Sequence, residues 1–560
     1  MANNILSLSS DKALEFLMTA SRYSNIEVPD YIDMTPILNY VREKVAETPY
    51  EKCVSSSPET HKGVNMELVL NKDGRYAVRP LSIVNPYLYY FLVRVLTEQN
   101  NWESVKECFK QFSVPHFNSC AIPIIPEKNE HFHNATSVLN WWNSMEQRSL
   151  ELSLKYRYMF KSDIRNCYGA VNLQTIDWAL SLKGTDCETT DNHDLANSII
   201  SLIQNMQGGK SFGMPQGSDV FDLIAEIILG YADKLLHSKI IADGIKCNYE
   251  ILRYRDDYRI FCNDKDALHD ISFLLQEVLR SLNFDMNSQK TTVTEDLIAD
   301  SIKADKLSYI FNTPIFNKKG CDFDGIQKHL LYILLFARKY PNAGQVKILL
   351  SDLANRIEQK IQEATPKENK YETVAFDWDD EDAQIENLLV KLEQAEESIK
   401  LKETETKGMV FNQLKVYPCK TWEPICENIK AMSAIATQIA IENVLCGHYA
   451  LGVISRLLSV VTDNEKKDII TLVRTKLCAQ PNSDYMQLWM QAITYSMDKE
   501  SKQCPYTLPL CKIVMGRKAV VWNNDWIKSE FREKFPVMRM CNKKTLKESG
   551  SVITFKERRA

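Results

Sequence analysis

Two adjacent aspartates, Asp256 and Asp257, stand between the short apolar segments Ile251–Tyr254 and Tyr258–Cys262. Side chains alternate along a strand, so neighbouring aspartates normally point to opposite faces, whereas a tight turn lets both reach one locality. Two carboxylates that close repel each other unless a cation neutralises them. The pattern therefore predicts a β-hairpin whose turn carries a metal-binding pair.

A third carboxylate is needed if this pair serves phosphoryl transfer, because two metal ions must be bridged by acids and substrate oxygens. Mg²⁺ prefers few carboxylates, with phosphates and waters completing its octahedron. Asp163 is the candidate, since it lies near the end of the apolar strand expected over Arg157–Ile164. An acid in this position is common at metal sites and equally common at ordinary turns.

A glycine-containing loop, Gly213-Met214-Pro215-Gln216-Gly217-Ser218, directly precedes a helix expected over Asp219–Tyr231. The apolar residues Val220, Ile224, Ile227, Ile228 and Tyr231 form one stripe of that helix. Glycines allow close backbone approach, and a helix start offers free N–H groups to an anion. By itself the segment could also be an ordinary helix-entry loop.

A second hairpin is expected nearer the N-terminus, with strands at Met66–Leu70 and Arg75–Val84. The turn between them, Asn71-Lys72-Asp73-Gly74, contains the Asp-Gly pair that supplies the positive φ such turns need. Pro80 lacks a backbone donor, so the second strand should lie at an edge.

The order of these motifs resembles that of reverse transcriptases. Phe160-x-x-Asp163, Pro215-Gln216-Gly217 and Tyr254-x-Asp256-Asp257 resemble motifs A, B and C, with Asp163 lying 93 residues before Asp256. Downstream, Asn287-Ser288-Gln289-Lys290-Thr291 resembles motif D.

The resemblance implies a metal and proton-transfer chemistry. Asp163, Asp256 and Asp257, with the backbone carbonyl of Ile164, would hold two Mg²⁺ ions, for which Mn²⁺ could substitute. Lys290 would act as the general acid for the leaving pyrophosphate, and its alternative interpretation is a surface lysine.

The resemblance also implies a nucleotide site. Lys72 and Arg79 look like the finger residues that hold the incoming triphosphate, and Gln216 would contact the incoming nucleotide. Tyr168 stands five residues after Asp163, where reverse transcriptases carry an aromatic steric gate against a ribose 2′-OH. dNTPs are therefore the expected substrates, and Tyr168 argues against a primer- and template-dependent RNA polymerase.

The expected fold class is α+β: a right-hand-like fingers–palm reverse transcriptase core followed by an all-α helical-repeat C-terminal domain. The expected domains are residues 1–110 (N-terminal helical segment and fingers), 111–320 (palm with motifs A to D), 321–410 (helical thumb-like region) and 411–560 (α-helical, repeat-like, with a basic tail). Residues 376–406 are strongly acidic, which is typical of an exposed helix or a linker.

Beyond the palm, the chain resembles bacterial defence-associated reverse transcriptases, including the abortive-infection group. This similarity rests on features such as Ala13–Leu17, Tyr254–Phe261 and Arg338–Gly344. It implies an anti-phage role, a single-stranded DNA product and a homo-oligomer. Relatives differ in whether synthesis is protein-primed, untemplated or directed by a non-coding RNA, and the sequence leaves these open.

Composition bounds these expectations. The chain has 560 residues and a net charge of −5, so contact with phosphates must come from local basic surface. It shows no secretory signal and no apolar run long enough for a membrane helix, which favours the bacterial cytoplasm and no membrane partner. The fifteen cysteines form no CxxC, as in a reducing compartment. The alternative function is a non-catalytic nucleic-acid-binding or assembly module that senses a phage component through its helical domain.

Overall fold

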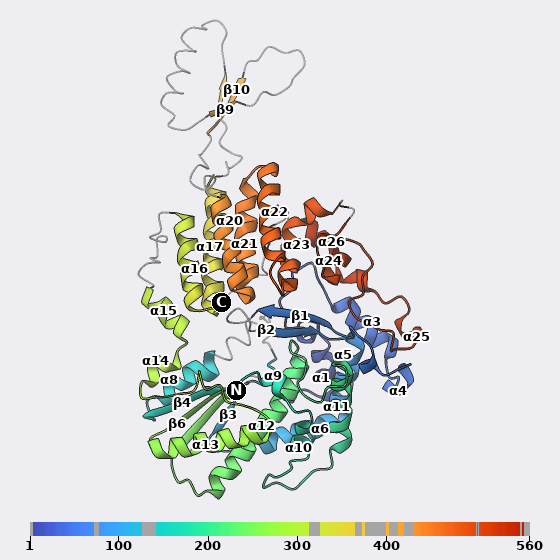
Figure 1. Ribbon diagram of the computed structural model, residues 1–560, viewed down its shortest axis with the longest axis vertical. Helices are drawn as coiled ribbons and strands as arrows, with labels where there is room; N and C mark the ends of the chain where they lie inside the picture. Colours follow the sequence, from blue (N-terminus) through green and yellow to red (C-terminus); the bar gives the residue numbers. More distant parts are fainter. Residues whose placement is uncertain are drawn as a thin grey trace. The chain divides into compact units, whose positions relative to one another are not determined.

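The computed structural model describes residues 4–71, 78–125, 142–312, 325–364, 372–375, 399–401, 413–418, 429–499, 501, 503–548 and 552–553. The chain divides into two compact units (Figure 1). The first unit comprises Met1–Phe311 and Asn482–Ala560, and the second comprises Asn312–Pro481.

A five-stranded sheet in the order β3-β5-β6-β4-β7 is the centre of the first unit. All neighbouring strands are antiparallel except β3 and β5, which are parallel. The strands are β3 (Phe117–Ser119), β4 (Tyr158–Asp163), β5 (Tyr249–Tyr254), β6 (Asp257–Cys262) and β7 (Thr292–Thr294). The strands expected near Asp163 and on both sides of Asp256 are thereby confirmed.

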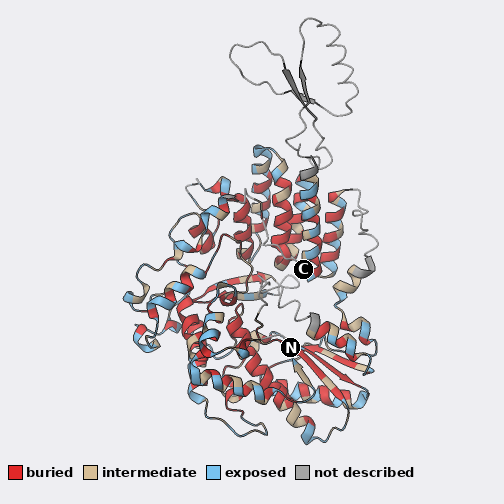
Figure 2. Cartoon of the chain, turned by 180° about the vertical axis from the view of Figure 1, so that it is seen from behind, coloured by how far each residue is buried: buried red, intermediate tan, exposed pale blue. Residues whose placement is uncertain are grey.

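Both faces of this sheet are covered over most of their area, and Figure 2 shows the strands coloured mainly as buried. The helices α12 (Asp219–Ala242) and α13 (Lys265–Ser281) pack together, and α13 contacts β4 and β6 (Figure 1). On the other face, Met159, Leu252 and Phe261 pack in a cluster with Met145 and Leu297.

Helix α12 is longer than the expected segment, which ended at Tyr231, because its second half buries polar residues that find partners. Lys234, for example, is 7% exposed and pairs with Asp186 at 2.8 Å. Further helices of this part of the chain include α1 (Ser10–Leu17), α2 (Ala20–Tyr23), α3 (Thr35–Val45), α4 (Tyr50–Cys53), α5 (Pro86–Thr97), α6 (Gln99–Phe112), α8 (Arg148–Leu152), α9 (Cys167–Ala170), α10 (Gln174–Leu180), α11 (His193–Met206), α14 (Leu297–Ser301) and α15 (Ala304–Asn312).

The N-terminal hairpin is confirmed as the antiparallel pair β1 (Met66–Asn71) and β2 (Val78–Ile83). Pro80 lies opposite Val69 in this two-stranded sheet, so it stands in an edge strand as expected. The predicted turn, including Lys72, lies outside the described residues.

The C-terminal segment from Asn482 onward packs on the N-terminal part of the chain, which differs from the expected domain over 411–560. The indole N–H of Trp522 donates to the carbonyl of Ile83 at 2.9 Å, and the hydroxyl of Tyr31 donates to the carbonyl of Leu488 at 2.8 Å. Trp526 is fully buried. Burial of these large aromatic side chains explains why the segment joins the first unit. Its helices are α23 (Asp484–Asp498), α24 (Pro509–Val514), α25 (Ser529–Arg532) and α26 (Lys543–Glu548).

The second unit is mainly helical and contains α16 (Ile326–Lys339), α17 (Gly344–Ala364), α20 (Ile429–Glu442), α21 (Gly447–Leu457) and α22 (Asp463–Cys478). The turns after α16 and α20 bind each other: Asn342 N–H donates to the Asn443 side chain at 2.8 Å, and Leu445 N–H donates to the Asn342 side chain at 3.0 Å. These links explain the helical pairing that the sequence indicated.

Three short strands in the second unit differ from the all-α expectation. They are β8 (Glu372–Ala375), β9 (Ile399–Leu401) and β10 (Gln413–Pro418), in the order β8-β10-β9. β9 falls within the acidic stretch 376–406, and the rest of that stretch lies outside the described residues.

None of the helices that the structure describes combines the length and the apolar character needed to cross a bilayer.

Candidate active site

The two adjacent aspartates lie at the tip of the β5–β6 hairpin, as the sequence predicted, with Asp256 in the turn and Asp257 at the start of β6. Tyr254 and Asp257 pair across the hairpin, so Arg255 and Asp256 form the turn itself. Arg255 adopts the left-handed conformation with φ 53°, which closes the chain tightly. Asp256 therefore projects from the turn, and Asp257 is the first residue of β6.

Asp163 lies at the same end of the sheet. It ends β4 and is the cross-strand partner of Asp257. The next residue, Ile164, donates its N–H to the carbonyl of Asp256 at 3.0 Å. These backbone pairings bring all three predicted aspartates to one place.

Asp163 is the most buried of the three, with 8% exposure. One carboxylate oxygen, Oδ2, accepts a hydrogen bond from Lys290 Nζ at 2.7 Å. The other, Oδ1, is buried and has no hydrogen-bond partner among the residues described. An unsatisfied buried carboxylate oxygen is costly, so its presence indicates a place for a ligand.

The remaining two acids have shifted titration. Burial raises the pKa of Asp256, and the charge of Asp163 raises it further. Withdrawal from water raises the pKa of Asp257 to about 6, with added repulsion from Asp256 and Asp163. The Asp257 side chain keeps an exposed surface, so water screens part of this effect. Mutual repulsion of this kind favours binding of a cation.

The residues at this end of the sheet suit a metal ion by the kind of donor atom they offer. Within the described ranges, no group of three or more acidic, histidine or cysteine side chains is placed so that together it could hold a metal ion. Asp163, Asp256 and Asp257 nevertheless supply the oxygen donors that Mg²⁺ prefers, including the unpartnered Oδ1 of Asp163. The carbonyl of Ile164, which accepts no hydrogen bond from any described residue, adds a fourth. In the structure, the ammonium group of Lys290 is the positive charge that pairs with the Asp163 carboxylate.

The loop before α12 is attached to the N-terminal hairpin. The carbonyl of Gln216 accepts from Ser82 N–H of β2 at 3.0 Å, and the carbonyl of Gly217 accepts from Asn25 N–H at 2.9 Å. Gly217 has φ 129°, and a Cβ there would lie 3.2 Å from the Ile26 side chain. Glycine is therefore required for this close approach.

These bonds bring Gln216 next to the strand that carries Arg79. The side chains of Gln216 and Arg79 are half-buried and make no hydrogen bond to other described residues, so both are available to a ligand. Lys72 falls in the part of the hairpin that is not described.

Tyr168, on α9, also lies at this end of the sheet. Its carbonyl accepts from Met214 N–H at 3.0 Å, which ties α9 to the loop before α12. Its hydroxyl donates to Asp222 Oδ1 in the first turn of α12. Burial, followed by the charge of Asp222, raises the pKa of Tyr168 well above its usual range.

Buried charges that were not among the residues predicted from the sequence support this site. Arg253 is 1% exposed, and its guanidinium pairs with Glu226 at 2.9 Å and Asp233 at 2.8 Å. Arg255 pairs with Asp222 at 2.6 Å. A signal was present: Asp222, Glu226 and Asp233 are spaced by four and seven residues within an apolar helix, which places them on one face.

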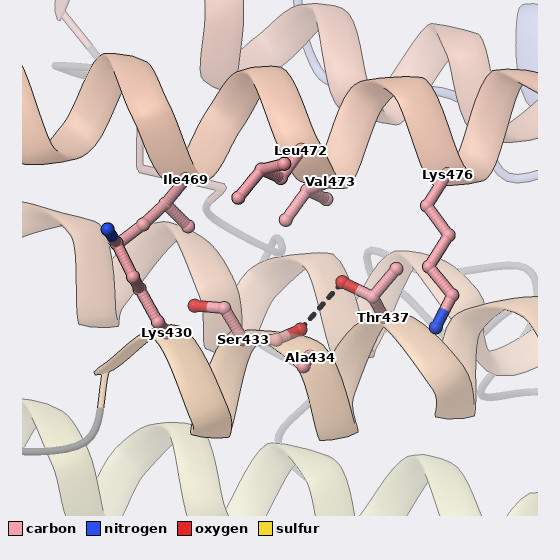
Figure 3. A pocket seen from close by; sticks show the side chains of 8 residues that line it. All are labelled: Lys430, Ser433, Ala434, Thr437, Ile469, Leu472, Val473 and Lys476. Carbon is pink, nitrogen blue, oxygen red and sulfur yellow. Dashed lines mark hydrogen bonds between the residues drawn. The ribbon is translucent and has the colours of Figure 1, made fainter.

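A separate groove of about 100 Å³ lies between α20 and α22 in the second unit (Figure 3). Aliphatic side chains and the hydroxyl residues Ser433 and Thr437 line it, with Lys430 and Lys476 at its two ends. It contains none of the site residues predicted from the sequence.

Part of the chain matches a known protein family. The family described as reverse transcriptase (RNA-dependent DNA polymerase) matches residues 103–327. No curated protein sequence matches the chain.

Solved telomerase structures are similar to the chain at low identity. Apo telomerase from Candida tropicalis truncated of its C-terminal domain has 14% identity and a TM-score of 0.28, with 46% of this chain and 54% of that chain covered. Telomerase from Candida albicans in complex with a fragment of telomeric RNA has 10% identity and a TM-score of 0.27, covering 78% and 68%. Apo telomerase from Candida tropicalis has 12% identity and a TM-score of 0.29, covering 77% and 73%. The chain thus spans about half the length of the first of these structures.

The matched segment contains β4, the loop before α12, the β5–β6 turn and Lys290, which are the elements that assemble the site. Residues 103–327 of this chain therefore form a reverse transcriptase domain.

Proposed function

We propose that the protein is a DNA polymerase of the reverse transcriptase type that adds dNTPs to a growing 3′ end. The observation that carries this proposal is the pairing of Asp163 with Asp257, together with the Ile164–Asp256 backbone bond, inside the segment that matches the family. Asp163 of β4, Asp256 of the turn and Asp257 of β6 lie at the same end of the sheet, and carboxylates are the ligands that two-metal phosphoryl transfer uses.

Each residue has a role in this proposal. Asp163, Asp256 and Asp257, with the Ile164 carbonyl, would hold two Mg²⁺ or Mn²⁺ ions, which when bound activate the attacking hydroxyl and neutralise developing charge. Arg79 and Lys72 bind the triphosphate, and Gln216 contacts the nucleotide. Tyr168 excludes the ribose 2′-OH, so dNTPs are preferred over rNTPs.

Lys290 is the proposed general acid. Burial alone would lower the pKa of Lys290, but its hydrogen bond to Asp163 and the nearby negative charges outweigh burial and raise that pKa. Lys290→Met should slow single-turnover dNTP incorporation by roughly 10²–10⁴-fold, the usual contribution of such a group. The same change frees Asp163 Oδ2, so the Mg²⁺ concentration for half-maximal rate should fall. An unchanged rate would make Lys290 only a surface partner of Asp163.

The direct test uses the purified full chain after nuclease treatment. Each labelled dNTP or rNTP is offered with Mg²⁺, with and without added RNA, and products are treated with protease to reveal a protein-linked 5′ end. We expect incorporation of dNTPs by the parent and none by Asp256→Asn. Asp285→Asn, which changes an exposed aspartate nearby, is the control and should behave like the parent. Equal incorporation by Asp256→Asn and the parent would refute the proposal.

We further propose that this synthesis acts in the cytoplasm of a bacterium against phage, in a homo-oligomer, with single-stranded DNA as product and a non-coding RNA as one candidate template. The resemblance to defence-associated reverse transcriptases supports this role. Phage plating on cells that express the parent or Asp256→Asn tests it. Protection by the parent alone is expected. Equal protection by Asp256→Asn would favour the non-catalytic assembly module instead.

A further inference from the structure

The carboxylate of Asp222 connects two residues of the active site. Its Oδ1 accepts the hydrogen bond of the Tyr168 hydroxyl, and its Oδ2 pairs with Arg255 Nη2 at 2.6 Å. The Asp222 side chain is 4% exposed, so the carboxylate at the centre of this bridge is buried, whereas the Arg255 side chain is 33% exposed.

The bridge joins three elements that are distant in sequence. Tyr168 is on the four-residue helix α9, Asp222 is in the first turn of α12, and Arg255 is in the turn that carries Asp256. Helix α9 is too short to fix a large side chain by itself, and its first flanking residue, Asn166, is left-handed with φ 50°. The Asp222 carboxylate is therefore the anchor for the far end of the Tyr168 side chain.

Arg255 also binds the Asp222 carboxylate. Among the residues that the structure describes, its guanidinium forms an ion pair with Asp222, and its Nε is buried without a hydrogen-bond partner. The ion pair therefore holds one oxygen of the Asp222 carboxylate while the other oxygen accepts from the tyrosine.

We propose that Asp222, held by Arg255, is a positioning residue that fixes the ring of Tyr168 and thereby sets the preference for dNTPs over rNTPs. This inference rests on the proposed function and deepens it. A steric gate works only if its ring cannot swing aside, because a ribose 2′-OH needs little extra room. The hydrogen bond from the Tyr168 hydroxyl to Asp222 holds the ring in place. A ring without this bond would exclude the ribose 2′-OH less well.

The prediction that separates this inference from simple bulk is Tyr168→Phe, which keeps the ring and removes the hydroxyl. If bulk alone mattered, selectivity would be unchanged. We expect the dNTP-to-rNTP preference to fall about tenfold, the effect of losing one hydrogen bond of about 1.4 kcal/mol. Asp222→Ala should lower the dNTP-to-rNTP preference by the same factor. Asp222→Asn, which keeps an acceptor for the tyrosine, should retain most of the preference.

A double-mutant cycle tests whether the two residues act as one unit. Tyr168→Phe combined with Asp222→Ala should be no worse than either change alone, since each breaks the same bond. Additive losses would overturn the inference. Should Asp222→Ala fail to fold, Tyr168→Phe and Asp222→Asn still decide the question.

The matched control is Tyr258→Phe. Tyr258 also donates its hydroxyl to an aspartate of α12, Asp233, at 3.1 Å, and that aspartate also binds an arginine, Arg253. Tyr258 is 1% exposed in the core behind the site. Its replacement should change the melting temperature and leave the nucleotide preference unchanged.

Selectivity is measured twice. Equilibrium binding of labelled dGTP and GTP in Ca²⁺ requires no turnover, and competitive incorporation in Mg²⁺ reports the reaction. A parent that binds dGTP selectively but polymerises nothing would refute the proposed function and leave this inference intact, provided Tyr168→Phe loses the binding preference. Tyr168→Phe with the parent's preference in both assays would refute the inference, as would a parent without preference.

Discussion

Replacement of Arg253 with methionine should lower the free energy of unfolding of the first unit by roughly 3–5 kcal/mol at pH 8. The guanidinium is 1% exposed and is shared by Glu226 and Asp233, which are 2% and 3% exposed. Methionine fills similar space but leaves two buried carboxylates without a counter-charge. Removal of one partner from a buried ion pair is far more costly than replacement of the whole pair by apolar side chains.

The deficit should shrink as the pH falls. Burial raises the pKa of Asp233 to about 6, although the charge of Arg253 acts in the opposite direction. An acid with a raised pKa in the folded state costs stability above that pKa, and the cost disappears as the pH falls towards the unfolded value of about 4. Without Arg253, protonation becomes still more favourable. The variant should therefore lie closer to the parent at pH 5 than at pH 8.

Chemical denaturation at the two pH values measures this effect, with tryptophan fluorescence as the signal. Arg148→Met is the control, because Arg148 is 44% exposed and its pairs with Glu151 and Glu250 lie at the surface. Its loss should be within about 1 kcal/mol. A deficit of Arg253→Met that is absent at pH 8, or equal at both pH values, would contradict the assignment of these buried charges.

The local part of the site could be predicted from the sequence. Short apolar segments flank Asp256 and Asp257, and the three residues between them, Arg255 to Asp257, leave room only for a tight turn. The strand that ends at Asp163 and the helix after Gly217 follow from equally local patterns. The structure confirms these elements, because neighbouring residues decide them.

The supporting interactions could not be predicted in the same way, because they depend on which elements pack together. Asp222, Glu226 and Asp233 look like acids that interrupt an apolar helix until β5 and the turn after it place Arg253 and Arg255 against them. Lys290 was interpreted from its motif, and its ion pair with Asp163 depends on β4 lying beside the turn at Asn287. Nothing local indicates that Trp522 bonds to Ile83, 439 residues away, and so the expected boundary at 411 differs from the structural one.

Replacement of Asp257 with asparagine should make the protein more stable without Mg²⁺ and nearly inactive with it. The aspartates Asp163, Asp256 and Asp257 repel one another, and the pKa of Asp257, raised to about 6, records the cost of ionising it there. Asparagine removes that charge, so the melting temperature in EDTA should rise at pH 8. The rise should vanish near pH 4, because Asp257 is then protonated in the folded state. It should be modest, because the exposed surface of Asp257 lets water screen the repulsion.

Loss of a proposed metal ligand acts in the opposite direction on the reaction. Removal of several kcal/mol of charge stabilisation in the transition state, about 4 kcal/mol, corresponds to a rate about 10³-fold lower. The increase in melting temperature caused by Mg²⁺ in the parent should also disappear. Asp285→Asn, at an exposed aspartate outside this cluster, should change none of the three quantities.

Stability in EDTA and activity are most informative when both are measured on the same variant. A variant that is both inactive and less stable in EDTA would indicate that Asp257 supports the fold, whereas an inactive variant that is more stable indicates a charge kept for a ligand at the expense of stability. Buried or crowded acids that gain stability when neutralised mark a functional site, because packing alone gives no reason for them. The unpartnered Oδ1 of Asp163 also marks a place for a ligand, but Asp163→Asn would break the ion pair with Lys290 as well, so Asp257→Asn is the cleaner test.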